Sequence, residues 1–174
     1  MGNPDYDNYC ATCFKHLWPD DPRSKLNYEH TKELAMRQAI NQDFEGFAHD
    51  QPLKTSHCDC TMRRRIDCRK NINGTLLAVE CDEFAHRRYD QEDEKNRYHD
   101  IMMAHGGKMI FIRFNPDLKG TSLESKLSVL VEEMHKQMER IDRGENSELL
   151  EVVYLFYPGL EPTGHGEGGK TPTQ

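Results

Sequence analysis

Residues 76–86 read Leu-Leu-Ala-Val-Glu-Cys-Asp-Glu-Phe-Ala-His, and this stretch decides how the rest of the chain is interpreted. An apolar run typical of a buried strand leads into carboxylates at Glu80 and Asp82, and then to His86. Side chains alternate along a strand, so the even-numbered residues are expected on one face and the odd-numbered residues on the other. Two carboxylates about 4 Å apart repel by roughly 4 kcal/mol at an effective dielectric constant near 20, unless a cation or a proton intervenes. We therefore expect a divalent metal ion at this end of the strand.

The residues before this stretch predict a second strand and a hairpin. Residues 62–70 can form a strand in which Asp67 is flanked by arginines two positions away on either side. The Asn-Gly pair at 73–74 is a strong hairpin signal, so the turn is expected to bring Asp67 beside Glu80 and Asp82. Three such acids form an oxygen-rich site that suits Mg²⁺ or Mn²⁺. The alternative for Asp67 is an ion pair with a neighbouring arginine.

The hydrophobic pattern of the whole chain predicts an α/β (α+β) fold. Helices are expected at 28–47, 90–105 and 121–143, and further strands at 108–114 and 152–157. Thr121 with Glu124 predicts a capping box at the start of the last helix. The expected order is α, (β), β, β, α, β, α, β, in which the bracketed strand has no residues assigned to it. A hairpin followed by βαβ crossovers gives a mixed central sheet flanked by helices.

Length and composition indicate one domain with short extensions. The chain has 174 residues, of which 36% are hydrophobic and 30% charged. We expect an N-terminal arm at 1–24, a core domain at 25–157 and a flexible tail at 158–174. No signal peptide and no apolar run of membrane-spanning length is predicted, so an intracellular rather than secreted protein is expected.

Two cysteine pairs predict a structural zinc site. Cys10 and Cys13 form a C-x₂-C pair, and Cys58 and Cys60 form a C-x-C pair, with His57 as a reserve ligand. Four thiolates would give a tetrahedral zinc site that joins the N-terminal arm to the start of the sheet. The alternative is a set of unconnected free thiols.

The net charge of −7 argues mildly against a nucleic-acid-binding protein, but arginines cluster around the acidic residues. Each charge run alone would be interpreted as a solvated face. Because the runs gather near Glu80 and Asp82, we expect them to contact phosphates, with salt-dependent binding. The arginines concerned are Arg63, Arg64, Arg65, Arg69, Arg87, Arg88 and Arg97.

These residues together resemble the restriction-endonuclease-like PD-(D/E)XK superfamily. The resemblance rests on Asp67, Glu80-x-Asp82-Glu83-x-x-His86, Asp90, Arg97, a Gly-Gly break, and Ile110-Phe-Ile-Arg-Phe-Asn-Pro-Asp117. It is strongest to the branch of the very-short-patch-repair (Vsr) endonucleases and the homing endonucleases with an E-D-x-H-D motif. The chain is also similar to uncharacterised proteins of large DNA viruses, and the resemblance covers approximately residues 8–157.

The resemblance implies an αβββαβ nuclease core that cleaves DNA with the help of a metal ion. Asp67 and Glu80 match the two metal-binding acids, and His86 matches the histidine of the Vsr-like branch. Glu33 matches a position that sometimes joins the metal shell. Asp82 stands where many relatives have a catalytic lysine, which is a departure from the common pattern. A location in the cytoplasm or nucleus of a host cell is implied.

We therefore expect a Mg²⁺-dependent endonuclease that hydrolyses phosphodiester bonds of double-stranded DNA, as a homing or mobile-element nuclease. Asp67, Glu80 and Asp82 would hold the metal ion, and His86 would act as general base or orient the water. A homodimer would explain double-strand cuts. One alternative is a catalytically decayed, zinc-containing nucleic-acid-binding module of the same fold. Another is a hydrolase of small phosphoesters.

Overall fold

The computed structural model describes residues 6–9, 14, 17–18, 20–24, 32–53, 65–83 and 91–158, and all structural statements concern these residues. Helices and strands follow one another in a single α+β order. They are α3 (Lys32–Asp43), β1 (Ala48–Pro52), β2 (Arg65–Ile72), β3 (Thr75–Cys81), α4 (Gln91–His105), β4 (Met109–Phe114), α5 (Leu123–Asp142) and β5 (Leu150–Leu155).

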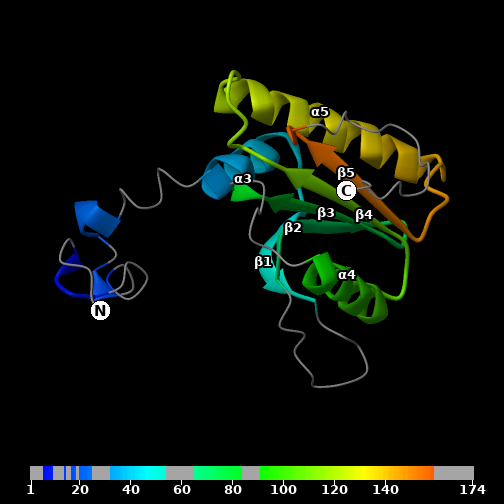
Figure 1. Cartoon of the computed structure of the whole chain (residues 1–174), viewed down its shortest axis with the longest axis horizontal. Helices are drawn as coiled ribbons and strands as arrows, with labels where there is room; N and C mark the ends of the chain where they lie inside the picture. The colour runs from blue at the N-terminus through cyan, green and yellow to red at the C-terminus, as the bar shows by residue number, and fades with distance from the viewer. Residues whose placement is uncertain are drawn as a thin grey trace, which may run out of the picture.

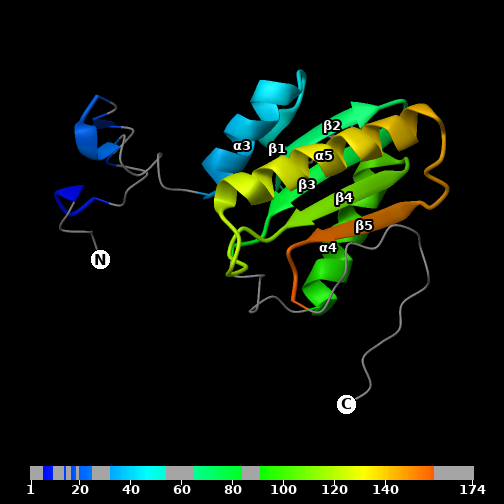
Figure 2. The same ribbon diagram turned by 90° about the horizontal axis from the view of Figure 1, so that it is seen from above.

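The strands form one five-stranded mixed sheet in the order β1-β2-β3-β4-β5 (Figure 1). β1 and β2 pair antiparallel, as do β2 and β3, whereas β3, β4 and β5 are parallel to one another. Helices α3 and α5 cover one face of the sheet, and α4 covers the other (Figure 2). This confirms the expected mixed central sheet flanked by helices.

The two central strands are buried on both faces, as the apolar runs predict. Every residue of β4 is buried, and in β3 only Cys81 at the end is partly exposed. Leu77 and Val79 pack towards α3 and α5, whereas Leu76 and Ala78 pack towards α4. The predicted alternation of side chains along β3 is therefore confirmed.

The predicted hairpin joins β2 to β3 as a two-residue turn. Ile72 pairs with Thr75, and the residues between them, Asn73 and Gly74, have φ angles of 49° and 81°. Asn and Gly are the residues that best tolerate positive φ, so the turn and the register of the hairpin follow from the local sequence.

Several element boundaries differ from the expected ones. The last strand, expected at 152–157, spans Leu150–Leu155. The helix predicted over 28–47 ends at Asp43, and the residues after it form β1 at the edge of the sheet, with Pro52 as its last residue. An edge strand tolerates proline because one of its sides has no partner strand. The N-cap of α5 is Ser122 and not Thr121, since the Ser122 side chain accepts a hydrogen bond from the backbone N–H of Ser125 at 3.2 Å.

The two parallel connections have opposite handedness. The steps from β3 to β4 and from β4 to β5 move in the same direction across the sheet, yet α4 and α5 lie on opposite faces (Figures 1 and 2). Since about 98% of such crossovers are right-handed, one of these two connections belongs to the rare left-handed kind.

None of the helices in the described part of the chain is both long and apolar enough to cross a membrane. The zinc-stapled arm cannot be compared with the structure, because Cys10, Cys13, Cys58 and Cys60 lie outside the described residues, as does His57.

Candidate functional site

The predicted acidic residues Asp67, Glu80 and Asp82 lie near the point where the pairing of β2 with β3 comes to an end. The ladder between these strands stops at the pair Cys68–Val79, although β2 continues to pair with β1. One residue further along β2, Asp67 Oδ2 accepts a hydrogen bond from the backbone N–H of Cys81 at 2.8 Å. A side-chain carboxylate thus takes the role that a backbone carbonyl has elsewhere in the sheet. This arrangement brings Asp67 to the carboxyl end of β3, as the sequence predicted.

Glu80 lies on β3, beside Asp67 of β2, and is almost completely buried. Its residue surface is 4% exposed, and burial raises the pKa of its carboxyl group to about 8. The charge of Asp67 acts in the same direction, whereas Arg97 opposes the shift. Arg97 comes from α4 and donates a hydrogen bond from Nη2 to Glu80 Oε1. Burial also raises the pKa of Asp67, against the bond from Cys81.

Glu33 lies in the first turn of α3, and we use the name acidic cluster for Glu33, Asp67 and Glu80. Desolvation raises the pKa of Glu33, and the charge of Asp67 acts in the same direction. Arg37, one turn later on α3, donates a hydrogen bond to Glu33 at 3.0 Å. The cluster therefore joins residues from one helix and two strands.

Asp82 is engaged differently from the acids of this cluster. Both of its carboxylate oxygens accept hydrogen bonds from the guanidinium group of Arg113 on β4, and the Nη2–Oδ1 distance is 2.9 Å. The hydroxyl group of Tyr157 also donates to Asp82. Arg113 in turn donates to Glu94 and to the hydroxyl group of Tyr98. Asp82 thus belongs to a buried ion-pair network that ties β3, β4 and α4 together.

Electrostatics maintains the charges in this network. Burial acts to lower the pKa of Arg113, but its bonds to Asp82 raise the pKa overall, so the guanidinium group stays protonated. The pKa of Tyr157 is raised by burial and by the charge of Asp82, which keeps its hydroxyl proton available for donation. An aspartate held by both oxygens in this way has little capacity left to bind a metal ion.

The remaining predicted site residues fall into two groups. Of the arginines, Arg97 lies in the site, Arg65 is exposed and paired with Asp50 at 2.9 Å, and Arg69 is half-buried with its pKa lowered by burial. The others lie outside the described residues, together with two further predicted site residues. These are His86, Asp90, Arg63, Arg64, Arg87 and Arg88.

The acidic cluster fits a hard divalent cation by its chemistry, but not by its present geometry. Carboxylate oxygens are the ligands that Mg²⁺ and Mn²⁺ prefer, and buried acids with raised pKa values gain most from a nearby cation. In the described part of the chain, however, no three acidic, histidine or cysteine side chains are gathered closely enough to hold a metal ion. Arginines instead form ion pairs with Glu80 and Asp82.

Arg113 was not among the predicted site residues, although the sequence of β4 contains a signal for it. Arg113 is the one charged residue in β4, whose sequence Met-Ile-Phe-Ile-Arg-Phe is otherwise apolar. A charge in a strand covered on both faces requires a buried partner of opposite sign. Its register partner on β3 is Glu80, but the side chain bonds Asp82 instead, which only the three-dimensional arrangement could show.

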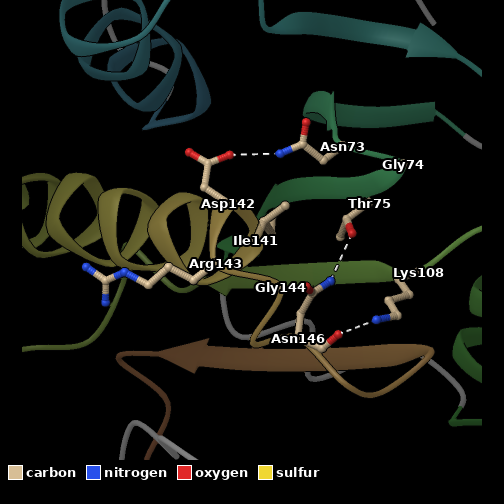
Figure 3. Close-up of a pocket in the computed structure, with 9 residues that line it drawn as sticks. All are labelled: Asn73, Gly74, Thr75, Lys108, Ile141, Asp142, Arg143, Gly144 and Asn146. Atoms are coloured by element: carbon tan, nitrogen blue, oxygen red, sulfur yellow. Dashed lines mark hydrogen bonds between the residues drawn. The ribbon is translucent and has the colours of Figure 1, made fainter.

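Two hollows in the surface lie away from the acidic cluster. One, of about 560 Å³, lies at the hairpin end of β3 (Figure 3), and its polar groups are largely bonded to one another. Asn146 bonds Thr75 at 2.9 Å, Lys108 bonds the carbonyl oxygen of Asn146, and Asn73 bonds Asp142. The other, of about 640 Å³, lies between α3 and α5 and is lined partly by leucines. Neither hollow contains a residue of the predicted site.

Comparison of the chain with protein-family models, with curated proteins and with solved structures found no match.

Proposed function

We propose that this chain is a metal-dependent endonuclease that hydrolyses phosphodiester bonds of DNA, built on a restriction-endonuclease-like αβββαβ core. The observation that carries the proposal is the pairing of Asp67 with Glu80 at the point where β2 and β3 separate. A buried carboxylate beside a half-buried one on the neighbouring strand, both with raised pKa values, is costly for stability alone. Such an arrangement is typical of functional sites.

The residues of the chain have distinct roles in this proposal. Asp67 and Glu80, with Glu33 beside them, would hold Mg²⁺ or Mn²⁺, and the bound ion would neutralise charge on the scissile phosphate and lower the pKa of the attacking water. Asp82 is proposed to support the site from the Arg113 network, which is a change from its predicted place among the metal ligands. His86 remains the proposed general base or water-orienting group.

Basic residues next to the acidic cluster support a polyanionic substrate. Arg97 lies within the site and Arg65 is exposed at the start of β2. Arginines are well suited to grip phosphates because their guanidinium groups donate two parallel hydrogen bonds. Double-stranded DNA is the proposed substrate, and a symmetric dimer would allow both strands to be cut. Zinc bound by the four cysteines is proposed to join the arm to this core.

The proposal is tested by incubating supercoiled plasmid DNA with the purified chain and Mg²⁺ or Mn²⁺. Wild-type protein is expected to nick or linearise the plasmid, and Glu80→Gln and Asp67→Asn are expected to lower the rate by about 100-fold or more. Glu132→Gln, an equivalent change at an exposed acid of α5, is the matched control and should cleave like wild type. If wild type and Glu80→Gln are equally inactive with every metal ion, the enzyme proposal is wrong.

A second candidate is a nucleic-acid-binding module of the same fold without catalytic activity. The observation that favours it is the pairing of Glu80 and Asp82 with arginines, which neutralises both acids without a metal ion. This candidate predicts that neither Mg²⁺ nor Asp67→Ala changes the affinity for DNA. If the chain is an endonuclease, both are expected to change it. Fluorescence anisotropy with a labelled duplex distinguishes the two.

A further inference from the structure

β5 lies at the edge of the sheet opposite β1, and one side of its backbone has no partner strand among the described residues (Figure 2). On the side of β4, the backbone carbonyl oxygens of Leu149 and Leu155 accept hydrogen bonds at 2.9 and 3.0 Å. Backbone groups alternate in direction along a strand, so the odd-numbered residues of β5 bond β4. The N–H and C=O groups of Leu150, Val152 and Tyr154 are therefore directed away from β4.

The two edges of the sheet differ in how they are protected against pairing with another strand. β1 ends in Pro52, and Asp50 within it has a φ angle of 46°. Proline and irregular backbone are common ways to protect an edge strand. β5 reads Leu-Glu-Val-Val-Tyr-Leu, with no proline and no positive φ angle, and most of its residues have high β-propensity. It is therefore the edge of this sheet that another strand can extend.

The side chains of β5 also leave this edge without an unpaired charge. Glu151 is the single charged residue of the strand, and it pairs with Arg140 of α5 at 2.9 Å, over one face of the sheet. Leu149, immediately before the strand, is 64% exposed. Addition of a strand at this edge would remove part of this apolar surface from water, which is favourable.

We propose that β5 pairs antiparallel with β5 of a second copy of this chain, across a twofold axis at Val152, so that two five-stranded sheets become one continuous sheet. In this register Leu150 lies opposite the partner's Tyr154, and each Val152 lies opposite its counterpart. Every N–H group directed away from β4 then meets a C=O group of the other copy. A twofold axis one residue earlier would instead place two Glu151 side chains opposite each other, which is unfavourable. The proposal uses the sheet alone and does not depend on endonuclease activity.

The first experiment measures the mass of the full chain by sedimentation velocity, in reducing buffer without divalent ions, at about 1–300 µM protein. Pairing of two short strands gives a small interface, so we expect weak association in the micromolar range. The average mass should rise with concentration from 20.3 kDa towards twice that value. A mass that stays at 20.3 kDa over the whole range would overturn the proposal.

Val152→Pro tests the interface specifically, because it removes an N–H group that β4 does not use. Proline is tolerated at such positions of an edge strand, so the variant is expected to fold and to associate about tenfold more weakly than wild type, or weaker still. Val152→Thr keeps the N–H group and the β-branched shape, and as the matched control it should associate like wild type. Circular dichroism and urea unfolding check that both variants are folded. Equal association of Val152→Pro and wild type would show that the copies meet at another surface.

Amide hydrogen exchange of wild type, followed by NMR in dilute and in concentrated protein, tests the same pairing without a variant. The amides of Leu150, Val152 and Tyr154 are expected to exchange several-fold more slowly in the concentrated sample, whereas the amide of Val153, on the side of β4, should not change. If the first three amides are equally protected in dilute, monomeric protein, residues of the same chain cover this edge and the proposal is wrong. None of these results bears on plasmid cleavage, so the proposed function is tested separately.

Discussion

The carboxyl group of Glu80 is subject to two opposing influences at the scale of a single residue. Burial at the end of β3 favours the protonated form, whereas the guanidinium group of Arg97 favours the charged form. Burial dominates, and the pKa rises to about 8 from its ordinary value of 4.5. The folded protein therefore binds a proton that the unfolded chain releases at neutral pH.

This shift predicts how stability depends on pH. Between pH 4.5 and 8 the folded state holds more protons at Glu80 than the unfolded state, so the contribution of this group to stability is lost as pH rises through this window. Glu80→Gln cannot titrate and lacks the effect. In urea unfolding without Mg²⁺ or Mn²⁺, the stability of wild type relative to Glu80→Gln is therefore expected to fall from pH 5 to pH 8. Parallel pH curves for the two proteins would contradict this.

Asp82 forms a buried ion pair with Arg113 and is therefore expected to contribute more to stability than the neighbouring acid Asp67. Asp82→Asn removes the negative partner of a buried arginine and is expected to lower the free energy of unfolding by roughly 3–5 kcal/mol. Asp67→Asn is the matched control, because an asparagine oxygen can still accept the bond from Cys81. It should cost less than about 1 kcal/mol.

Urea unfolding at pH 7 measures both variants. Equal losses of stability would show that Asp82 has no special structural role, and Asp82 would return to the set of metal-binding candidates.

At the scale of single elements, the clearest agreement with the sequence is in the hairpin and the buried strands. The Asn-Gly turn and the apolar runs of β3 and β4 are local signals, and the structure has each of them in the expected place. The expected order included a strand before β2 with no residues assigned to it, and β1, whose sequence Ala-His-Asp-Gln-Pro lacks the pattern of a strand, takes that place. Its formation depends on the partner strand β2, and local sequence carries no information about that partner.

The start of α5 offers a test at the same scale, because sequence and structure assign different N-cap residues. Ser122→Ala removes the acceptor for the Ser125 N–H group and is expected to lower the free energy of unfolding by about 1 kcal/mol. Thr121→Ala, the change at the residue that the sequence suggested, should have almost no effect. Urea unfolding measures the free energy of unfolding of the two variants. If Thr121→Ala loses more stability than Ser122→Ala, Thr121 is the N-cap.

At the scale of the whole molecule, the order of the strands brings residues from distant parts of the chain close together. Arg113 and Tyr157 lie 31 and 75 residues from Asp82 in the sequence, yet both bond its carboxylate. The crossovers of opposite handedness place α4 alone on one face, where its residues Glu94, Arg97 and Tyr98 all contact the site. The position of α4 thus determines which acids are neutralised by arginines.

The proposed zinc site is also a property of the whole chain, since its four cysteines come from two distant segments. Elemental analysis of protein purified under reducing conditions is expected to find about one zinc ion per chain. Cys58→Ser together with Cys60→Ser should abolish zinc binding and lower the thermal stability. Cys68→Ser, at a buried thiol of β2 outside the proposed ligand set, is the control and should retain zinc. Absence of zinc from fresh wild-type protein would contradict the proposal.

The alternation of helices and strands, the hairpin, and the acids at the ends of β2 and β3 can all be predicted from the sequence. These features follow from hydrophobic periodicity, turn residues and the spacing of charges, which act over a few residues. The pairing of Glu80 with Arg97, the pairing of Asp82 with Arg113, and the residues that form β1 become visible in the folded protein alone. The reason is that each of these contacts depends on strand order and helix placement, and buried charges bond whichever opposite charge the fold brings within reach.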